Sequence, residues 1–228
     1  RRDGSPMYRP PRPALTRDRV RHIGQAVAVV IAESVNQAKD AAEAIEVEYA
    51  ILPAQVSTAS ANQPGVPQLW PECANNEAMY VELGNGAAVD AAMAKAAHVV
   101  KEYFPVTRVA ASALEPRAVV AAYDEGRGHF TVYACMQRPY IWRTLMTQDI
   151  FRIPEHDMTL IAGDVGGSFG MKGGLYPEVP VAAWAARRLG RPVKWTCERS
   201  EALLADDQGR DMDVHAELGL DAEGRFLG

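Results

Sequence analysis

A glycine-rich stretch between an apolar run and a helical pattern constrains the fold of this chain more than any other feature. The run "HDMTLIAG" predicts a strand, and "YPEVPVAAWAARRLG" predicts a helix with Pro177 in its first turn and Gly190 at its end. Between them lies "GDVGGSFGMKGG". A loop placed in this way can turn free backbone N–H groups toward a ligand. Residues 163–174 therefore form either a ligand-binding loop or a loop whose glycines serve tight packing.

Two common phosphate-binding patterns do not fit these glycines. A Walker A loop requires Gly, Lys and Ser or Thr in succession, whereas Met171 separates Gly170 from Lys172 and Gly173 follows. The dinucleotide fingerprint GxGxxG matches no register of the stretch. Another type of ligand must be considered if the loop binds one.

Composition limits the class of protein. With 228 residues, 48% hydrophobic, the chain can form one large domain or two small ones, and its formal net charge of -5 argues against a general nucleic-acid binder. The cysteines and histidines are scattered without the spacing of a metal site, so no metal ligands are predicted. No apolar run reaches the roughly 18 residues of a membrane helix. We expect reduced thiols and a cytoplasmic location.

The N-terminal region predicts a βαβ-like unit. Residues 25–32, "QAVAVVIA", form an apolar and β-branched run typical of a buried strand. A helix capped by Ser34 or Asn36 follows, and "IEVEY" then alternates as a half-exposed strand. The pattern fades from residue 52 to 86, where Pro, Asn, Ser and Ala predominate, and this segment predicts a linker.

The second region predicts a mixture of helices and hairpins. We expect a helix over 87–97, a strand over 98–106, a hairpin around the turn "DEGRG", a helix over 140–151, a strand in "RPVKWTCE" and a last hairpin in "DMDVHAELGLDAEGRFL". Such an order favours an α+β protein over a doubly wound sheet.

Several stretches in fixed order resemble one family. "GGSFGMK" is similar to the GG-x-FG-x-K loop of the molybdenum hydroxylases, which include xanthine dehydrogenase, aldehyde oxidoreductase and the large subunit of carbon monoxide dehydrogenase. The stretches "IGQAVAVVIAESVNQAKDAAEAIEVEYAILPA", "SALEPRAVVA", "CMQRPYIWRTLM" and "LYPEVPVAAWAARRLGRPVKWTCERSE" also resemble that family, and together they cover about residues 20 to 228.

The resemblance implies a fold and a domain order. We expect part of an α/β hammerhead domain over residues 1–55, a linker over 56–86, and the first part of a mixed-sheet α+β molybdopterin-binding domain over 87–228. The chain then corresponds to an N-terminal fragment of a molybdenum-binding subunit, truncated at both ends.

The resemblance also implies candidate site residues. The loop lies beside the molybdenum pterin cofactor in that family, so Gly167, Ser168, Phe169 and Gly170 are predicted to approach it. Phe169 is expected either to line the substrate channel or to be a core aromatic. Gln137 either lies near the cofactor or fixes the loop, because its amide both donates and accepts hydrogen bonds.

The charged residues around these motifs have several possible roles. Lys172 is expected to answer negative charge on the ligand, to be solvated, or to pair with a carboxylate. Glu115 and Arg117 are expected, as a pair, to hold local structure, and Arg199 to form a surface ion pair. The xanthine-oxidising branch has a glutamate where this chain has Gly173, which argues against purine oxidation by its mechanism.

The implied reaction is hydroxylation of an aldehyde or aromatic heterocycle, with water as the oxygen source. Electrons would pass from molybdenum-molybdopterin, in a dinucleotide form, to [2Fe-2S] and FAD partners. The family's base glutamate is expected beyond the C-terminus, so this chain alone is predicted to be inactive. Two alternatives remain: a non-catalytic assembly module of a split or truncated subunit, and an unrelated α+β binding domain whose glycine loop packs tightly.

Overall fold

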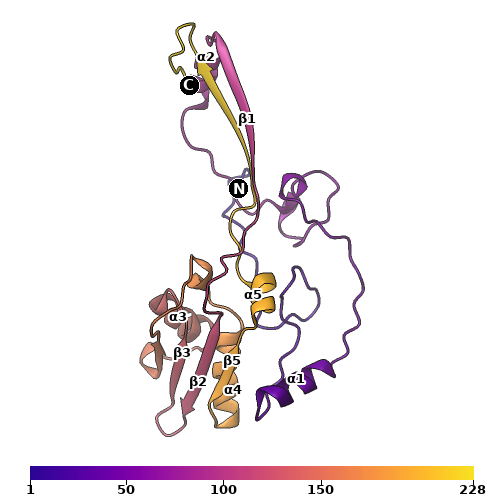
Figure 1. Cartoon of the computed structure of the whole chain (residues 1–228), viewed down its shortest axis with the longest axis vertical. Helices are drawn as coiled ribbons and strands as arrows, with labels where there is room; N and C mark the ends of the chain where they lie inside the picture. The colour runs from indigo at the N-terminus through magenta and orange to yellow at the C-terminus, as the bar shows by residue number, and fades with distance from the viewer. The chain divides into compact units, whose positions relative to one another are not determined.

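The computed structural model describes residues 1–228 and contains six strands in two sheets (Figure 1). The chain divides into two compact units that are interleaved along the sequence. We call residues 1–11, 50–109 and 210–228 the ribbon unit, and residues 12–49 and 110–209 the core unit. The domain boundaries predicted at residues 55 and 86 stay predictions.

The helices and strands have the following bounds. The α-helices are α1 (Val35–Glu43), α2 (Gly86–Met93), α3 (Pro139–Thr144), α4 (Glu178–Leu189) and α5 (Arg199–Ala205). The strands are β1 (His98–Val106), β2 (Ala118–Asp124), β3 (His129–Ala134), β4 (Met158–Ile161), β5 (Val193–Thr196) and β6 (Met212–Leu220). Short 3-10 turns are η1 (Thr58–Ser60), η2 (Ala74–Asn76), η4 (Glu155–Asp157) and η5 (Met171–Gly173), and η3 (Leu145–Phe151) is a π-helix.

The core unit contains a mixed four-stranded sheet in the order β4-β3-β2-β5. The predicted hairpin of β2 and β3 is confirmed, with Val119 opposite Ala134. Its turn closes because Asp124 Oδ1 accepts the N–H of Arg127 at 3.1 Å and Gly128 adopts a φ of 65°. Strand β4 pairs in parallel with β3, whereas β5 pairs antiparallel with β2. The α+β fold class predicted from the sequence is confirmed.

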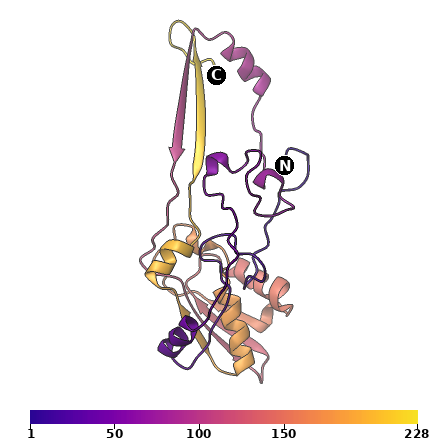
Figure 2. The ribbon, with the colours of Figure 1, turned by 90° about the vertical axis from the view of Figure 1, so that its right-hand side faces the viewer.

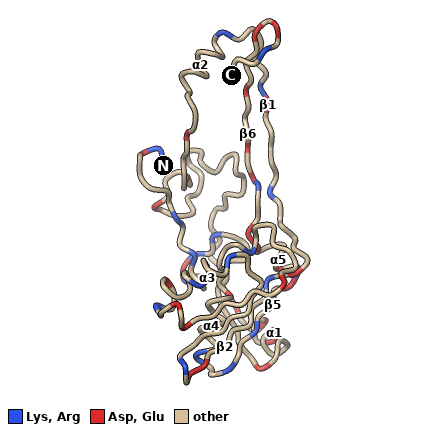
Figure 3. Tube along the Cα trace, turned by 90° about the vertical axis from the view of Figure 1, so that its left-hand side faces the viewer, with Lys and Arg blue, Asp and Glu red and all other residues tan.

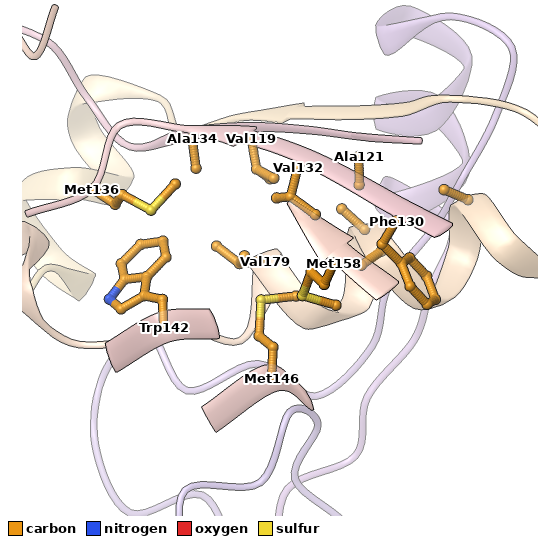
Figure 4. Packing of buried hydrophobic residues seen from close by; sticks show 13 residues of the cluster. Val119, Ala121, Phe130, Val132, Ala134, Met136, Trp142, Met146, Met158 and Val179 are labelled. Atoms are coloured by element: carbon orange, nitrogen blue, oxygen red, sulfur yellow. The ribbon is translucent and has the colours of Figure 1, made fainter. Parts of the chain in front are cut away.

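One face of this sheet carries the hydrophobic core. Alternate residues of β2 and β3 are buried, as expected for strands with one covered face. Side chains from α3, η3 and α4 pack against them in a single cluster (Figure 4). The cluster contains Val119, Ala121, Phe130, Val132, Ala134, Met136, Trp142, Met146, Met158, Val179, Ala182, Ala183 and Ala186. The helices therefore form one layer on the sheet, directly after the segments that hold Gln137 and the glycine loop.

Helix α4 ends as its sequence predicts, but it begins at Glu178, directly after the proline that was expected in its first turn. Pro177 stands at the N-cap, and Gly190 terminates the helix in a left-handed conformation with a φ of 63°. Four buried alanines allow close approach of the helix to the sheet, namely Ala182, Ala183, Ala185 and Ala186. This packing fixes where the glycine loop, which immediately precedes α4, leaves the sheet.

The ribbon unit contains the antiparallel pair β1–β6, with His98 opposite Leu220 and Val106 opposite Met212. Helix α2 lies beside the end of this ribbon (Figure 2). A Cβ on Gly219 would lie 2.8 Å from Met93 Sδ, so the glycine allows the contact. The strand predicted over 98–106 is confirmed. The predicted turn after β6 brings Phe226 opposite Leu220, and the N–H of Leu227 donates to the carbonyl of Gly219 at 2.9 Å.

Two strands predicted near the N-terminus are wrong. Residues 25–32 and 45–49 are in no strand, although the helix between them is confirmed as α1 with Ser34 as its N-cap. Ser34 Oγ accepts the N–H of Gln37, and the Gln37 side chain accepts the N–H of Ser34. An apolar run becomes a strand only where a neighbouring segment pairs with its backbone. No segment of this chain does so here.

Two further elements differ from the prediction. The helix predicted over 140–151 changes from α3 to the π-helical η3, where buried Thr147 Oγ1 donates to the carbonyl of Arg143 at 2.8 Å. Such back-bonding by threonine competes with regular helical bonds and bends a helix. Helix α5 was not predicted, because its seven residues are too few for a periodic signal.

We predict that Phe130→Ala destabilises the core unit by about 3–5 kcal/mol, because it opens a cavity in the cluster. Phe130 is 1% exposed, and its ring centroid lies 4.6 Å from that of Tyr123 and 5.0 Å from that of Phe151. Urea unfolding measures the change. The control is Tyr140→Ala, at a largely exposed aromatic, for which we expect at most about 0.5 kcal/mol. Equal effects would contradict the core assignment.

Candidate functional site

Residues 163–174 form the glycine loop, and its first half is hydrogen-bonded to Glu115 through Gly166. The N–H of Glu115 donates to the carbonyl of Gly166 at 3.0 Å, and the N–H of Gly166 donates to Glu115 Oε2 at 2.9 Å. A Cβ on Gly166 would lie 2.6 Å from Glu115 Cβ. Only glycine allows the two segments to approach this closely.

Lys172 supports the same contact from inside the core unit. Its side chain is fully buried, and Nζ donates to Glu115 Oε2 at 2.7 Å. Burial alone would raise the pKa of Glu115, but the hydrogen bonds from Lys172 and from the Gly166 N–H outweigh it and lower that pKa. Of the roles considered for Lys172, pairing with a carboxylate is confirmed. Glu115 therefore pairs with Lys172 and not with Arg117.

Gln137 and Ser168 hold the second half of the loop. Ser168 Oγ donates to Gln137 Oε1 at 2.8 Å and accepts the N–H of Lys172 at 3.1 Å. The N–H of Gln137 donates to the carbonyl of Lys172 at 3.1 Å. The structure thus brings Gln137 to the loop that contains the other predicted residues, Gly167, Ser168, Phe169 and Gly170. Their contact with a cofactor stays a prediction.

Residues 166–170 also have the spacing Gly-x-Ser-x-Gly, which is typical of a serine nucleophile in hydrolases. That chemistry requires a base that accepts the serine proton. Ser168 Oγ donates instead to the amide oxygen of Gln137, which is not a base. The geometry supports a structural hydroxyl.

Phe169 points out of the loop. Its side chain is 80% exposed and its backbone adopts a φ of 53°, in the left-handed region that a bulky residue seldom occupies. Its ring lies over Gly167, where a Cβ would be 3.2 Å from Phe169 Cε2. The alternative of a core aromatic is wrong. Strained residues of this kind cluster at functional sites, so the observation favours a role in binding.

Three consecutive backbone N–H groups of the loop have no acceptor in the chain. They belong to Ser168, Phe169 and Gly170, whereas the N–H groups on either side, of Gly167 and Met171, donate to carbonyls of the loop. Gly170 adopts a φ of 95°, and a Cβ there would have no neighbour within 4 Å. Successive N–H groups in such a turn attract electron-rich ligands. The residues present therefore fit a ligand rich in oxygen or sulfur acceptors.

Arg117 joins the elements behind the loop. Nε donates to Asp206 Oδ1 at 2.7 Å, and Nη1 pairs with Glu178 at the start of α4. The guanidinium carbon lies 3.9 Å from the ring centroid of Tyr176. Tyr176 donates to the carbonyl of Met171 at 3.0 Å, and burial raises the pKa of this phenol to about 12. The local structural role predicted for Arg117 is confirmed.

Arg199 does not form the predicted surface ion pair. Nη1 donates to the carbonyl of Ala113 at 2.6 Å, and Nη2 donates to that of Leu114. Ala113 and Leu114 lie in an irregular segment, where their carbonyls have no partner in a sheet. These carbonyls accept the N–H groups of Arg199 that would otherwise donate to a carboxylate. Because Ala113 lies against Gly167, this contact supports the glycine loop from the other side.

Sequence reasoning missed how these residues combine. Glu115 and Lys172 are 57 positions apart, and no periodic pattern joins them. Arg138, next to Gln137, was not singled out, although its side chain lies against Gly173.

Basic and acidic residues are scattered along the trace of each unit (Figure 3). None of the helices combines the length and apolar character that crossing a membrane requires.

Comparison with protein families gives two matches. The molybdopterin cofactor-binding domain matches residues 69–228, and the a/b hammerhead domain of aldehyde oxidase and xanthine dehydrogenase matches residues 3–53. The 6-hydroxypseudooxynicotine dehydrogenase complex subunit gamma of Paenarthrobacter nicotinovorans is 38% identical over 223 residues, which is 95% of this chain and 27% of that protein.

Solved structures show the same relationship. A Cu,Mo-CO dehydrogenase in its carbon monoxide reduced state matches with a TM-score of 0.88 and 33% identity, over 93% of this chain and 28% of that chain. Quinoline 2-oxidoreductase from Pseudomonas putida 86 matches with a TM-score of 0.84 and 33% identity, over 94% of this chain and 27% of that chain. The chain thus spans about a quarter of the length of these relatives.

We predict that Glu115→Gln destabilises the core unit by about 3 kcal/mol, because it leaves the buried ammonium of Lys172 without a counter-charge. The double variant Glu115→Gln/Lys172→Met should recover most of this loss, since the buried charge is then absent. Urea unfolding at pH 7 measures both. Glu33→Gln, which breaks an exposed pair with Arg191 at 2.9 Å, is the control and should cost at most about 0.5 kcal/mol. A double variant as unstable as the single one would contradict the assignment.

The lowered pKa of Glu115 also predicts a pH dependence. A carboxylate whose pKa is lower in the folded state stabilises the fold above its unfolded-state pKa and loses that effect as pH falls through the folded value. The stability difference between wild type and Glu115→Gln should therefore be constant near neutrality and shrink below about pH 4.5, the ordinary value. Unfolding series from pH 7 to pH 3 measure it. A difference that persists unchanged at pH 3 would exclude this coupling.

Proposed function

This chain belongs to the molybdenum hydroxylase family, and we propose that it forms one wall of the cofactor site in an enzyme that hydroxylates an aldehyde or aromatic heterocycle. The oxygen atom would come from water. The match to the molybdopterin cofactor-binding domain and the similarity to CO dehydrogenase support a place in the molybdopterin-binding subunit of a molybdenum-dependent oxidoreductase.

One observation carries the proposal. The N–H groups of Ser168, Phe169 and Gly170 lack acceptors and follow one another along a loop that is fixed on both sides. Glu115 fixes its beginning and Gln137 its later part. Preorganised donors of this kind bind electron-rich groups without the cost of ordering the loop. Oxygen and sulfur ligands around a metal are such groups.

The residues of this chain would bind and orient the cofactor and the substrate. When bound, the cofactor supplies a metal centre that accepts two electrons from the substrate. Gln137 has an amide N–H₂ group that donates to no protein atom, because its only side-chain contact uses the oxygen. This group is free to donate to an acceptor beside the loop. Phe169 would exclude water from one side of the site and offer an apolar surface to a flat substrate.

The remaining parts of the proposal concern the whole protein. The base glutamate would lie outside this chain, the cofactor would be in a dinucleotide form, and electrons would leave through [2Fe-2S] and FAD partners. A relative is named as the gamma subunit of a complex, which supports assembly with other subunits. Quinoline, in the name of another, is an aromatic heterocycle. A cytoplasmic location is supported by three unpaired cysteines.

A second candidate is an assembly module that is inactive alone. It is favoured by the short span of the chain relative to its relatives. The two candidates differ in turnover: a complex that contains this chain together with molybdenum should oxidise an aldehyde or a heterocycle, whereas a non-catalytic module should only associate. Steady-state assays of the purified complex with an artificial electron acceptor separate them.

We predict that Gly166→Ala lowers the molybdenum content of the assembled complex at least severalfold, since its Cβ would meet Glu115 Cβ at 2.6 Å and displace the loop. Gly163→Ala is the matched control, because a Cβ there has no neighbour within 4 Å. Elemental analysis of the copurified complex measures molybdenum per chain. A complex without molybdenum in the wild type would overturn the proposed function, and equal contents in both variants would exclude a role of the loop.

A further inference from the structure

An arginine beside the glycine loop has no partner in the protein. Arg138 follows Gln137, its side chain is exposed, and it forms no hydrogen bond or ion pair with any residue of the chain. Three other arginines near the loop are engaged: Arg117 with two carboxylates, Arg143 with Glu155, and Arg199 with two carbonyls. The guanidinium of Arg138 is therefore available to a ligand.

The guanidinium of Arg138 lies beside Gly173 of the loop. A Cβ on Gly173 would lie 3.7 Å from Arg138 Nε, 3.9 Å from its Cζ and 3.5 Å from Gln137 Oε1. Both side chains thus lie over the same glycine. Gln137 in turn contacts Ser168 of the loop at 2.8 Å. Arg138 is consequently at the margin of the surface that presents the free N–H groups.

The nitrogen atoms of Arg138 and Gln137 offer this surface hydrogen-bond donors. The guanidinium offers five N–H donors and no acceptor, and the amide nitrogen of Gln137 offers two more. The carboxylates around the loop have partners of their own, since Glu115 accepts from Lys172 and Glu178 pairs with Arg117. Asp207, which lies beside Gly174, pairs with Arg12 at 3.7 Å. A planar fork of donors matches the two oxygens of a carboxylate, or those of a phosphate. The exposed ring of Phe169, on the same loop, adds an apolar surface.

We propose that Arg138, together with the amide of Gln137, forms an anion-recognition subsite at the edge of the cofactor wall. The ligand group is an oxyanion with two or more equivalent oxygens. It comes either from a carboxylate on an aromatic substrate or from a phosphate of the cofactor. This inference rests on the proposed function for the identity of the bound molecules, whereas the anion binding itself depends only on the geometry of this chain.

Ligand-observed NMR of the 228-residue chain tests the subsite. Saturation transfer to benzoate probes the carboxylate source, with neutral benzamide as its matched counterpart, and the ³¹P line width of inorganic pyrophosphate probes the phosphate source. All titrations are made at constant ionic strength. Arg138→Gln and Arg138→Lys are compared with Arg127→Gln, which alters an exposed arginine in the turn at the other end of β3.

We expect benzoate or pyrophosphate to bind the wild type and Arg127→Gln equally, and Arg138→Gln to weaken that binding roughly tenfold, as for loss of a hydrogen bond to a charged group. Arg138→Lys should retain only part of the affinity, because it lacks the fork. Preference for benzoate assigns the subsite to the substrate, and preference for pyrophosphate assigns it to the cofactor. Binding of neither anion, equal binding of benzamide, or binding unchanged in Arg138→Gln would overturn the proposal.

A negative result would leave the proposed function standing. Molybdenum in the copurified complex depends on the glycine loop, whereas anion binding is measured on the chain without the metal. In the assembled complex, Arg138→Gln should also lower kcat/KM for 4-formylbenzoate relative to benzaldehyde if the substrate is the source. It should lower the molybdenum content and leave this ratio unchanged if the cofactor is the source.

Discussion

The buried ammonium group of Lys172 is the constraint on which the candidate site depends. A charge that is fully removed from water is tolerated only beside an opposite charge, and Glu115 is its sole hydrogen-bond partner. The same oxygen, Glu115 Oε2, also accepts the N–H of Gly166 at 2.9 Å. The hydrogen bond that holds the loop and the ion pair that compensates the charge of Lys172 therefore depend on the same carboxylate oxygen. A buried pair of this kind adds little net stability, yet removing either partner is costly.

Arg117, which is also buried, joins the elements behind the loop in a similar way. It joins the start of α4, the residue after α5 and the ring of Tyr176. Tyr176 extends the network to the backbone of the loop through Met171 and accepts the N–H of Asp207 at 2.8 Å. These bonds are shielded from solvent, so they are stronger and more specific in direction than surface ion pairs. Together the two networks hold the loop from both sides, although few of its own residues pack in the core.

The parts of this structure that were predictable are those with local causes. Three elements are specified by neighbouring residues: the start of α1 by Ser34, the end of α4 by Gly190, and the hairpin of β2 and β3 by the turn from Asp124 to Gly128. The order of residues around Gly167 indicated the family, and the stretch "CMQRPYIWRTLM" drew attention to Gln137. Pairing partners have no such signature, so residues 25–32 were assigned to a strand that does not form. For the same reason the Glu115–Lys172 contact and the carbonyl contacts of Arg199 became evident only in three dimensions.

The glycines of the loop act in two different ways, which composition alone does not separate. Gly166 is required because Glu115 occupies the space of a side chain, whereas Gly170 faces open space and is required by its backbone conformation. The first kind holds the loop against the protein, and the second turns consecutive N–H groups outward. Phe169, between them, accepts an unfavourable φ so that its ring stands exposed beside those donors. An exposed aromatic next to unsatisfied donors has no benefit for folding, and this combination is the strongest physical argument that the surface binds a ligand.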